Sequence, residues 1–205
     1  MTLEVLEPPS VDRLYFWALQ ASFLDGSGSV GAGHLGLQWN PRYPDHKAVN
    51  WGGYYTRGAV LPGSDSSLPS TPLDPNTRDF PWLPGRRYRL RIYPSPELGW
   101  RGEVTDTDTG VVTVVRDLHV GGGHPGRVMV WSELFCECTD PRAVVGWSEA
   151  NAVGLGGEHL APRALRVNYQ PDGCSNTNVF ADGHRVYQAT ASDRITPQGS
   201  LVALP

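Results

Sequence analysis

The stretch GAGHLGLQWNPRYPDHKAVNWGGYY, residues 31–55, contains two short runs in which the character of the side chains alternates. In an extended chain, successive side chains point to opposite faces. In the first run, residues 35–40, the leucines and the tryptophan therefore share one face, and the glycine and the amides share the other. The second run, residues 50–55, places aromatic rings beside glycines, where another strand or a ligand can approach the backbone closely. The pattern predicts two half-buried β-strands joined by a polar connector.

The same period of two recurs along the chain. Residues 10–24 alternate in aromatic and aliphatic side chains, which favours a strand over a helix. Residues 87–93 alternate arginine with apolar residues, and residues 100–120 read as a hairpin around TDTDTG, with Gly110 expected at positive φ. We expect about ten strands and little or no helix. The sequence thus predicts an all-β fold, a two-sheet antiparallel sandwich of the jelly-roll type.

The domain organisation is expected to be simple. No repeat at a fixed period and no linker divides the chain, so residues 1–205 are expected to form a single domain. Residues 57–85 carry six prolines and no periodic pattern, which predicts a long loop. With Phe80 and Trp82 as anchors, this loop is either a lid over a concave sheet or a rigid wrapping along one edge.

Composition and charge exclude several classes of protein. The formal net charge is −4, charged residues make up 19% of the chain, and no basic cluster occurs, so we expect neither a nucleic-acid partner nor an anionic membrane surface. No apolar run approaches the roughly 20 residues that span a bilayer. The first residues, MTLEVLEPPSVDR, lack the basic region and apolar core of a secretory signal. A cytoplasmic protein is predicted, and a secreted mature form stays open.

Three cysteines leave three alternatives open. Cys136 and Cys138 form a C-x-C motif, and Cys174 lies in the loop sequence PDGCSNT. A disulfide from Cys174 to one of the pair, a zinc site completed by His159 or His184, and ordinary thiols are all compatible with the sequence. The spacing fits no standard zinc finger, so no metal and no cofactor is predicted.

A tripeptide, Trp-Ser-Glu, occurs twice, at residues 131–133 and 147–149. Within a strand, each tryptophan projects from the same face as the glutamate two positions later. The short connector predicts that the two strands are antiparallel neighbours, which would bring both pairs onto one wall. Glu133 and Glu149 are then candidates for the carboxylate pair of a glycoside-cleaving site, for which a separation of roughly 5 Å or roughly 6.5–9.5 Å is required.

The layout of several segments carries a family resemblance. GAGHLGLQWN, NWGGYY, RYRLRIYPS, WRGEVTDTDTG and VMVWSELF follow one another in an order that resembles the concanavalin A-like β-sandwich group of lectins and glucanases, and in particular a bacterial carbohydrate-associated domain. The resemblance implies two packed antiparallel sheets, the concave one presenting aromatic and polar side chains to a saccharide. The chain lacks the E-x-D-x-x-E strand of the glucanases of this group, so their activity is not transferred.

The function predicted from these patterns is carbohydrate binding, with a saccharide or another small polar ligand as partner. Indole rings would stack on the ligand, and amides and carboxylates would bond its hydroxyl groups. Two alternatives remain: a glycoside hydrolase or lyase that uses Glu133 and Glu149, and a non-catalytic structural or oligomer-forming sandwich. The predicted ligand-binding residues are Gln38, Asn40, Trp51, Tyr54, Trp131, Glu133, Trp147 and Glu149.

Overall fold

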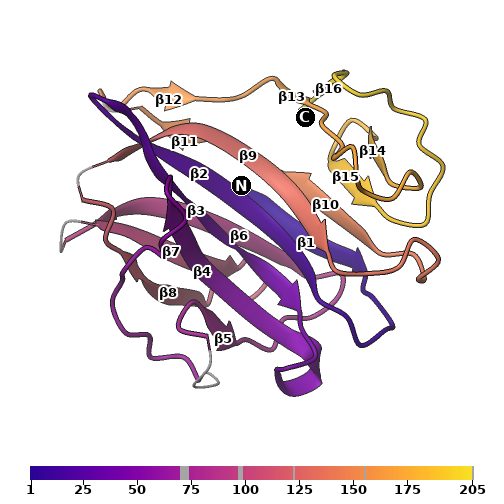
Figure 1. Cartoon of the computed structure of the whole chain (residues 1–205), viewed down its shortest axis with the longest axis horizontal. Helices are drawn as coiled ribbons and strands as arrows, with labels where there is room; N and C mark the ends of the chain where they lie inside the picture. Colours follow the sequence, from indigo (N-terminus) through magenta and orange to yellow (C-terminus); the bar gives the residue numbers. More distant parts are fainter. Residues whose placement is uncertain (70–73, 97–98, 122, 155, 205) are drawn as a thin grey trace. The chain divides into compact units, whose positions relative to one another are not determined.

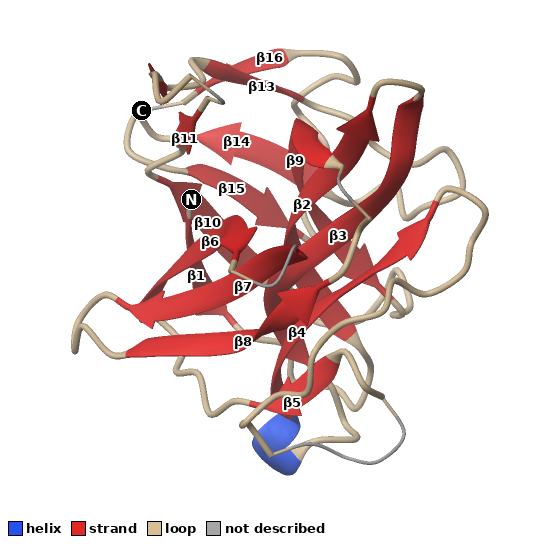
Figure 2. Cartoon of the chain, turned by 90° about the vertical axis from the view of Figure 1, so that its left-hand side faces the viewer, coloured by secondary structure: helices blue, strands red, loops and turns tan. Residues whose placement is uncertain are grey.

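The computed structural model describes residues 1–69, 74–96, 99–121, 123–154 and 156–204. Within these ranges the only helical element is a single 3-10 turn, η1 (Pro44–His46), and strands account for the remaining regular structure (Figures 1 and 2). The strands are β1 (Thr2–Glu7), β2 (Tyr15–Asp25), β3 (Gly28–Trp39), β4 (Lys47–Tyr55), β5 (Thr77–Asp79), β6 (Arg87–Ser95), β7 (Gly99–Asp106), β8 (Val112–Leu118), β9 (His124–Leu134), β10 (Val144–Ser148), β11 (Ala152–Val153), β12 (His159–Leu160), β13 (Ala164–Arg166), β14 (Asn178–Ala181), β15 (Val186–Ala189) and β16 (Leu201–Ala203).

The strands form two main antiparallel sheets in a sandwich, as predicted. One sheet has the order β14-β15-β10-β1-β6-β7-β8, and the other has the order β5-β4-β3-β2-β9. The chain comprises two compact units: a first unit of Met1–Val11, Leu83–Tyr88 and Cys136–Pro205, and a second unit of Asp12–Trp82 and Arg89–Phe135. Strand β6 runs from the first unit into the second. The single domain over residues 1–205 stays a prediction.

In the second unit, two layers enclose an aromatic core. Strands β9, β2, β3 and β4 run side by side (Figure 1). Trp51 on β4 is fully buried and donates its indole N–H to the backbone oxygen of Trp100 on β7 at 3.0 Å. A Cβ atom at Gly102 would lie only 2.5 Å from the ring of Trp51, so glycine is required there for the layers to approach. The sequence-based prediction that Trp51 faces a ligand is therefore wrong.

The first unit has a similar arrangement around Trp147. Strand β10 is buried along its whole length, and Trp147 donates its indole N–H to Gln188 Oε1 on β15 at 2.9 Å. Trp147 is fully buried and presents no ring surface to a ligand, which corrects a second prediction. The two Trp-Ser-Glu strands are not neighbours, because β9 pairs with β2, whereas β10 pairs with β1 and β15. The predicted wall of two Trp/Glu pairs does not form.

The described residues of the long segment 57–85 are mostly loop, as predicted, and include the short strand β5. One of its predicted anchors, Trp82, is fully buried and donates its indole N–H to the backbone oxygen of Gln38 at 3.0 Å. Its ring lies edge-on to Trp17, with 6.2 Å between ring centroids. This end of the segment is therefore fixed against the sheet. Residues 70–73, which belong to the same predicted loop, lie outside the described ranges.

The turn between β7 and β8 also follows the prediction. Asp106 Oδ1 accepts hydrogen bonds from the backbone N–H groups of Asp108 and Thr109, and Gly110 adopts a φ of 72°. Only glycine adopts this left-handed backbone conformation without steric cost, so the sequence TDTDTG encodes a hairpin turn.

An ion pair on β7 and β8 makes stability depend on pH. Asp117 accepts hydrogen bonds from Nε and Nη2 of Arg101 at 2.8 and 2.9 Å, and another from the Ser95 hydroxyl. The hydrogen bond from Arg101 is the main reason why the pKa of Asp117 is lowered from its ordinary value. A carboxylate with a lowered folded-state pKa stabilises the fold above its unfolded-state pKa, and this contribution disappears as the pH falls through the folded-state value.

We therefore expect Asp117→Asn to lower the free energy of unfolding at neutral pH by about 2 kcal/mol. The difference between wild type and variant should begin to shrink as the pH falls below about 4, because the carboxyl of the unfolded state becomes protonated there. It should disappear once the pH has also fallen through the lower folded-state pKa. Urea denaturation at a series of pH values measures this difference. A difference that stays constant from neutral to strongly acidic pH would show that the charge of Asp117 is not responsible.

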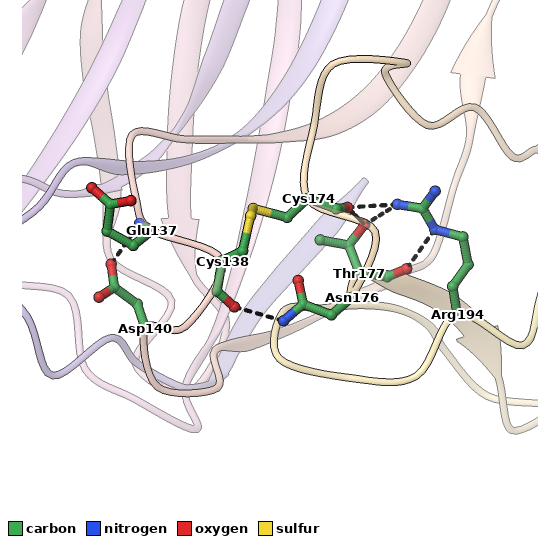
Figure 3. The surroundings of a disulfide bond; sticks show 7 residues. All are labelled: Glu137, Cys138, Asp140, Cys174, Asn176, Thr177 and Arg194. Carbon is green, nitrogen blue, oxygen red and sulfur yellow. Dashed lines mark hydrogen bonds between the residues drawn. A yellow bond between two sulfur atoms is a disulfide. The ribbon is translucent and has the colours of Figure 1, made fainter.

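A disulfide cross-links the first unit. Cys138 and Cys174 are bonded to each other (Figure 3), and Cys136 is not part of a disulfide, which rules out the three-cysteine zinc site. Hydrogen bonds from Asn176 Nδ2 to the backbone oxygen of Cys138, at 2.6 Å, and from Arg194 Nη2 to that of Cys174, at 2.7 Å, hold both ends (Figure 3). The disulfide alternative, which the sequence left open, is the one that the structure contains.

Removing this disulfide should destabilise the first unit. The bond closes a loop with a sequence separation of 36, for which the chain-entropy relation gives about 4 kcal/mol. We expect the double variant Cys138→Ser/Cys174→Ser to lose about this much unfolding free energy in a denaturant titration. Cys136→Ser is the matched control, since it removes a neighbouring thiol and no cross-link. Equal denaturation midpoints for wild type and the double variant would contradict the expectation.

Candidate functional site

The candidate site lies on the outer face of the sheet β5-β4-β3-β2-β9, the face opposite to buried Trp17 and Trp51. The register places Phe16 on β2 between two polar residues: Glu133 on β9 is its cross-strand partner on one side, and Gln38 on β3 is its partner on the other. Partners in a cross-strand row project from the same face. Neighbouring strands lie about 4.8 Å apart, so the Cα atoms of Glu133 and Gln38 are roughly 10 Å apart.

Glu133 supplies a carboxyl group with no partner. Its side chain is only partly exposed, and within the described ranges its carboxyl makes neither a hydrogen bond nor an ion pair. Partial burial of the group raises the pKa of Glu133 above its ordinary value. At mildly acidic pH, a raised pKa makes the protonated and ionised forms of the carboxyl more nearly equal in free energy. A group that accepts and returns a proton during a reaction needs both forms to be accessible.

Gln38 supplies an amide on the opposite side of Phe16. It is 5% exposed, and its Oε1 accepts a hydrogen bond from Asn40 Nδ2 at 2.9 Å. Its Nε2 makes no hydrogen bond with any described residue. The backbone oxygen of Gln38 accepts the indole N–H of Trp82, which holds the strand in place beneath the side chain. The two free N–H bonds of Nε2 are thus available to an acceptor on the outer face.

Aromatic rings adjoin these polar groups. Trp131, two residues before Glu133 on β9, lies edge-on to Phe16 at 5.0 Å and to His34 at 5.7 Å between ring centroids. Tyr54 is half exposed, and its ring lies 6.0 Å from that of His34. Burial lowers the pKa of His34 to about 4, so above that pH its ring is neutral. The cluster gives the outer face an uncharged, partly exposed apolar surface beside Glu133.

Five of the eight residues predicted from sequence lie on the outer face of the sheet of the second unit or directly after one of its strands. Strand β3 carries Gln38, and Asn40 follows its last residue. Strand β4 carries Tyr54, and strand β9 carries Trp131 and Glu133.

Glu149 does not belong to the second unit. It belongs to the first unit, where its two carboxylate oxygens accept hydrogen bonds from the Thr2 hydroxyl at 2.7 Å and from Arg87 Nη2 at 2.6 Å. Its carboxylate is therefore engaged in holding its own unit together. The strand pairing that was to bring it beside Glu133 does not exist, so the predicted pair of catalytic glutamates has no structural basis.

Sequence reasoning missed Phe16 and His34. His34 shares its face with Gly36 and Gln38 in the run GHLGLQ, so the period of two could have placed it on the candidate face. Phe16 gave no such signal, because both faces of β2 carry apolar residues and only the register assigns this ring to the outer face.

The described ranges contain no cluster of three histidine, cysteine, aspartate or glutamate side chains arranged to hold a metal ion. No helix among them combines the length and apolarity needed to cross a bilayer.

Comparison with known proteins connects the fold to peptidases. No protein-family model and no curated protein matches the sequence. Among solved structures, the fold is similar to that of SCP-B, a member of the eqolisin family of peptidases, in complex with the tripeptide Ala-Ile-His. The TM-score is 0.51 and the sequence identity is 12%, and the match covers 91% of this chain and 88% of that chain. It is also similar to scytalido-glutamic peptidase with a peptide-based transition-state analogue, with a TM-score of 0.52, 10% identity and the same coverage.

At these identities the likeness concerns the fold alone, and it corrects three predictions. The sandwich matches peptidases of the eqolisin family, so the resemblance to the concanavalin A-like lectin and glucanase group was wrong at the level of family. Carbohydrate binding, with Trp51 and Trp147 as stacking rings, has no support from the matches, and both rings are buried. The glycoside hydrolase alternative is likewise overturned, because the matched enzymes are peptidases.

Proposed function

We propose that the outer face hydrolyses peptide bonds, with Glu133 as the proton-transferring group and Gln38 as the donor to the carbonyl oxygen of the substrate. One observation carries the proposal: an unpartnered carboxyl with a raised pKa and an amide nitrogen with free N–H bonds flank Phe16 in one cross-strand row. Hydrolysis of an amide needs both groups, one to move a proton and one to stabilise the oxyanion.

The proposed reaction balances with these two side chains and one water molecule. The ionised Glu133 carboxylate accepts a proton from water as the water oxygen bonds to the peptide carbonyl carbon. The carbonyl oxygen becomes an oxyanion, which accepts hydrogen bonds from Gln38 Nε2. Glu133 then returns the proton to the leaving nitrogen as the C–N bond breaks, leaving a carboxylic acid and an amine. At the end of the cycle Glu133 is again ionised.

The fold comparison supports a glutamate in this role. One of the two matched structures is named a glutamic peptidase, and both contain a bound peptide or peptide-like molecule. An extended peptide suits a sheet face of this kind, on which the aromatic cluster of Trp131, His34 and Tyr54 provides apolar surface for a substrate side chain beside Glu133.

Digestion of a mixed peptide library tests the proposal. The purified protein is incubated with peptides of varied sequence in buffers from acidic to neutral pH, and new termini are identified by mass spectrometry. We expect cleavage products with a consistent residue preference around the cleaved bond. An absence of products at every pH, from protein shown to be folded by circular dichroism, would overturn the proposal and leave the non-catalytic sandwich as the better account.

A further inference from the structure

We infer that Asn40 is a positioning residue that fixes which end of the Gln38 carboxamide faces the candidate site. The inference rests on the proposed function for its consequences, and on hydrogen bonds alone for its geometry. A carboxamide has a donor end and an acceptor end of nearly equal shape, so its orientation is set by its partners. Only one of the two orientations presents N–H bonds to an oxyanion.

The orientation is determined by a chain of two hydrogen bonds that starts at the backbone of Arg42 and runs through Asn40 to Gln38. The N–H of Arg42 can only donate, and it donates to the side chain of Asn40 at 3.1 Å. The atom of Asn40 that accepts this bond must therefore be Oδ1. Its Nδ2 must then be the atom that faces Gln38, where it donates at 2.9 Å. The accepting atom of Gln38 is consequently Oε1, and Nε2 is the end that remains for the outer face.

Backbone hydrogen bonds hold Asn40 in the position that this chain of side-chain hydrogen bonds requires. Its N–H donates to the backbone oxygen of His46 at 2.6 Å, and its own backbone oxygen accepts the N–H of Tyr43 at 3.0 Å. These bonds close the turn between β3 and β4 on either side of η1. Both side chains are more than nine-tenths buried, at 5% exposure for Gln38 and 7% for Asn40. Water therefore competes weakly for their hydrogen bonds, and the orientation persists.

The clearest perturbation is Asn40→Asp, which keeps the shape of the side chain and replaces its donor end by an acceptor. Two acceptors would then face each other, and rotation of the Gln38 carboxamide by half a turn relieves the clash by letting Nε2 donate to residue 40. Gln38 Oε1 would then face the site and repel an oxyanion. We expect kcat for peptide hydrolysis to fall about 100-fold with KM nearly unchanged.

Asn50→Asp is the matched control. Asn50 lies on the same outer face, on β4, and is buried to a similar degree at 6% exposure. Its side-chain amide donates to Thr77 Oγ1 and not to Gln38. It tests the effect of a buried carboxylate on this sheet, and kcat should stay within about threefold of wild type. If Asn40→Asp does not fold, Asn40→Ala removes the donor without adding charge, and a smaller fall in kcat is expected. A rise in KM with kcat unchanged in Asn40→Asp would overturn the positioning role. Equal losses of kcat in Asn40→Asp and Asn50→Asp would overturn it as well.

A measurement independent of activity separates this inference from the proposed function. Both residues are buried to a similar degree, so their hydrogen bonds decide how fast their side-chain amide protons exchange with solvent. In the 15N-labelled wild-type protein, those of Asn40 should exchange more slowly because Nδ2 donates to Gln38, whereas those of Gln38 make no hydrogen bond with a described residue and should exchange faster. The reverse order of exchange would show that the carboxamide is turned the other way and would overturn the inference, whether or not the protein cleaves peptides. The expected order without any peptide cleavage would support the geometry and count against the proposed function alone.

Discussion

Glu133→Gln is expected to lower kcat/KM for peptide hydrolysis by about 1,000-fold, within the range by which a positioned proton-transferring group accelerates a reaction. The substitution keeps the length and shape of the side chain but leaves it unable to exchange a proton with water. Because the Glu133 carboxyl makes no hydrogen bond or ion pair with any described residue, its replacement removes no interaction that holds the fold together. The variant should therefore unfold at the same denaturant concentration as the wild type or slightly above it.

Glu149→Gln is the matched control for this loss. The sequence offered Glu149 as an equal candidate in an identical tripeptide, but its carboxylate is occupied by Thr2 and Arg87. We expect this variant to retain its activity and to lose up to about 1 kcal/mol of stability, as is usual for a partly exposed ion pair. Equal activity losses in the two variants, or full activity in Glu133→Gln, would contradict the assignment of Glu133.

Trp51→Ala is expected to destabilise the second unit by about 4 kcal/mol, a value typical of a fully buried aromatic residue in a core. The indole is 0% exposed, it donates to the backbone oxygen of Trp100, and it fills the space above Gly102 and Gly33. Truncation leaves a cavity that the rigid strands on both sides cannot close, and it leaves the oxygen of Trp100 without this donor. Urea denaturation followed by tryptophan fluorescence measures the loss.

Tyr54→Ala is the control on the same strand. Its ring is 50% exposed on the outer face, so its loss should change the unfolding free energy by no more than about 1 kcal/mol. A loss for Trp51→Ala as small as that for Tyr54→Ala would contradict the placement of Trp51 between the layers. It would also reopen the interpretation, made from sequence, of Trp51 as a residue that faces a ligand.

The period of two was sufficient to predict the class of fold but not the pairing of the strands. Alternation in residues 31–55 correctly separated an apolar face with Leu35 and Leu37 from a face with Gln38, and the glycine in TDTDTG correctly marked a hairpin. Alternation is a local property, however, and pairing is decided by contacts between distant segments. The repeated tripeptide Trp-Ser-Glu suggested that β9 and β10 were neighbours, yet the two strands pair with different partners.

The same limit explains which site residues could be predicted. The same local sequence is compatible with a strand tryptophan that packs in the core and with one that faces a ligand. Trp51 and Trp131 lie on opposite faces of the sheet, and only the strand pairing decides which face each one takes. Gln38 and Asn40 were found because alternation put both amides on one face of residues 35–40, and Glu133 was found through the repeated tripeptide Trp-Ser-Glu. Their arrangement around Phe16 depends on the register of three strands, which no pattern within a single strand contains.

The central claim is that Glu133 and Gln38 act together on one bound peptide group, and a double-mutant cycle tests it most directly. The measurement is kcat/KM for one peptide substrate with wild type, Glu133→Gln, Gln38→Ala and the combined variant. Groups that serve a single reaction are strongly non-additive, so the combined variant should be no more than a few-fold slower than Glu133→Gln alone. Losses that simply multiply would show that the two side chains act separately, and activity that none of the substitutions changes would place peptide hydrolysis elsewhere or remove it from this protein.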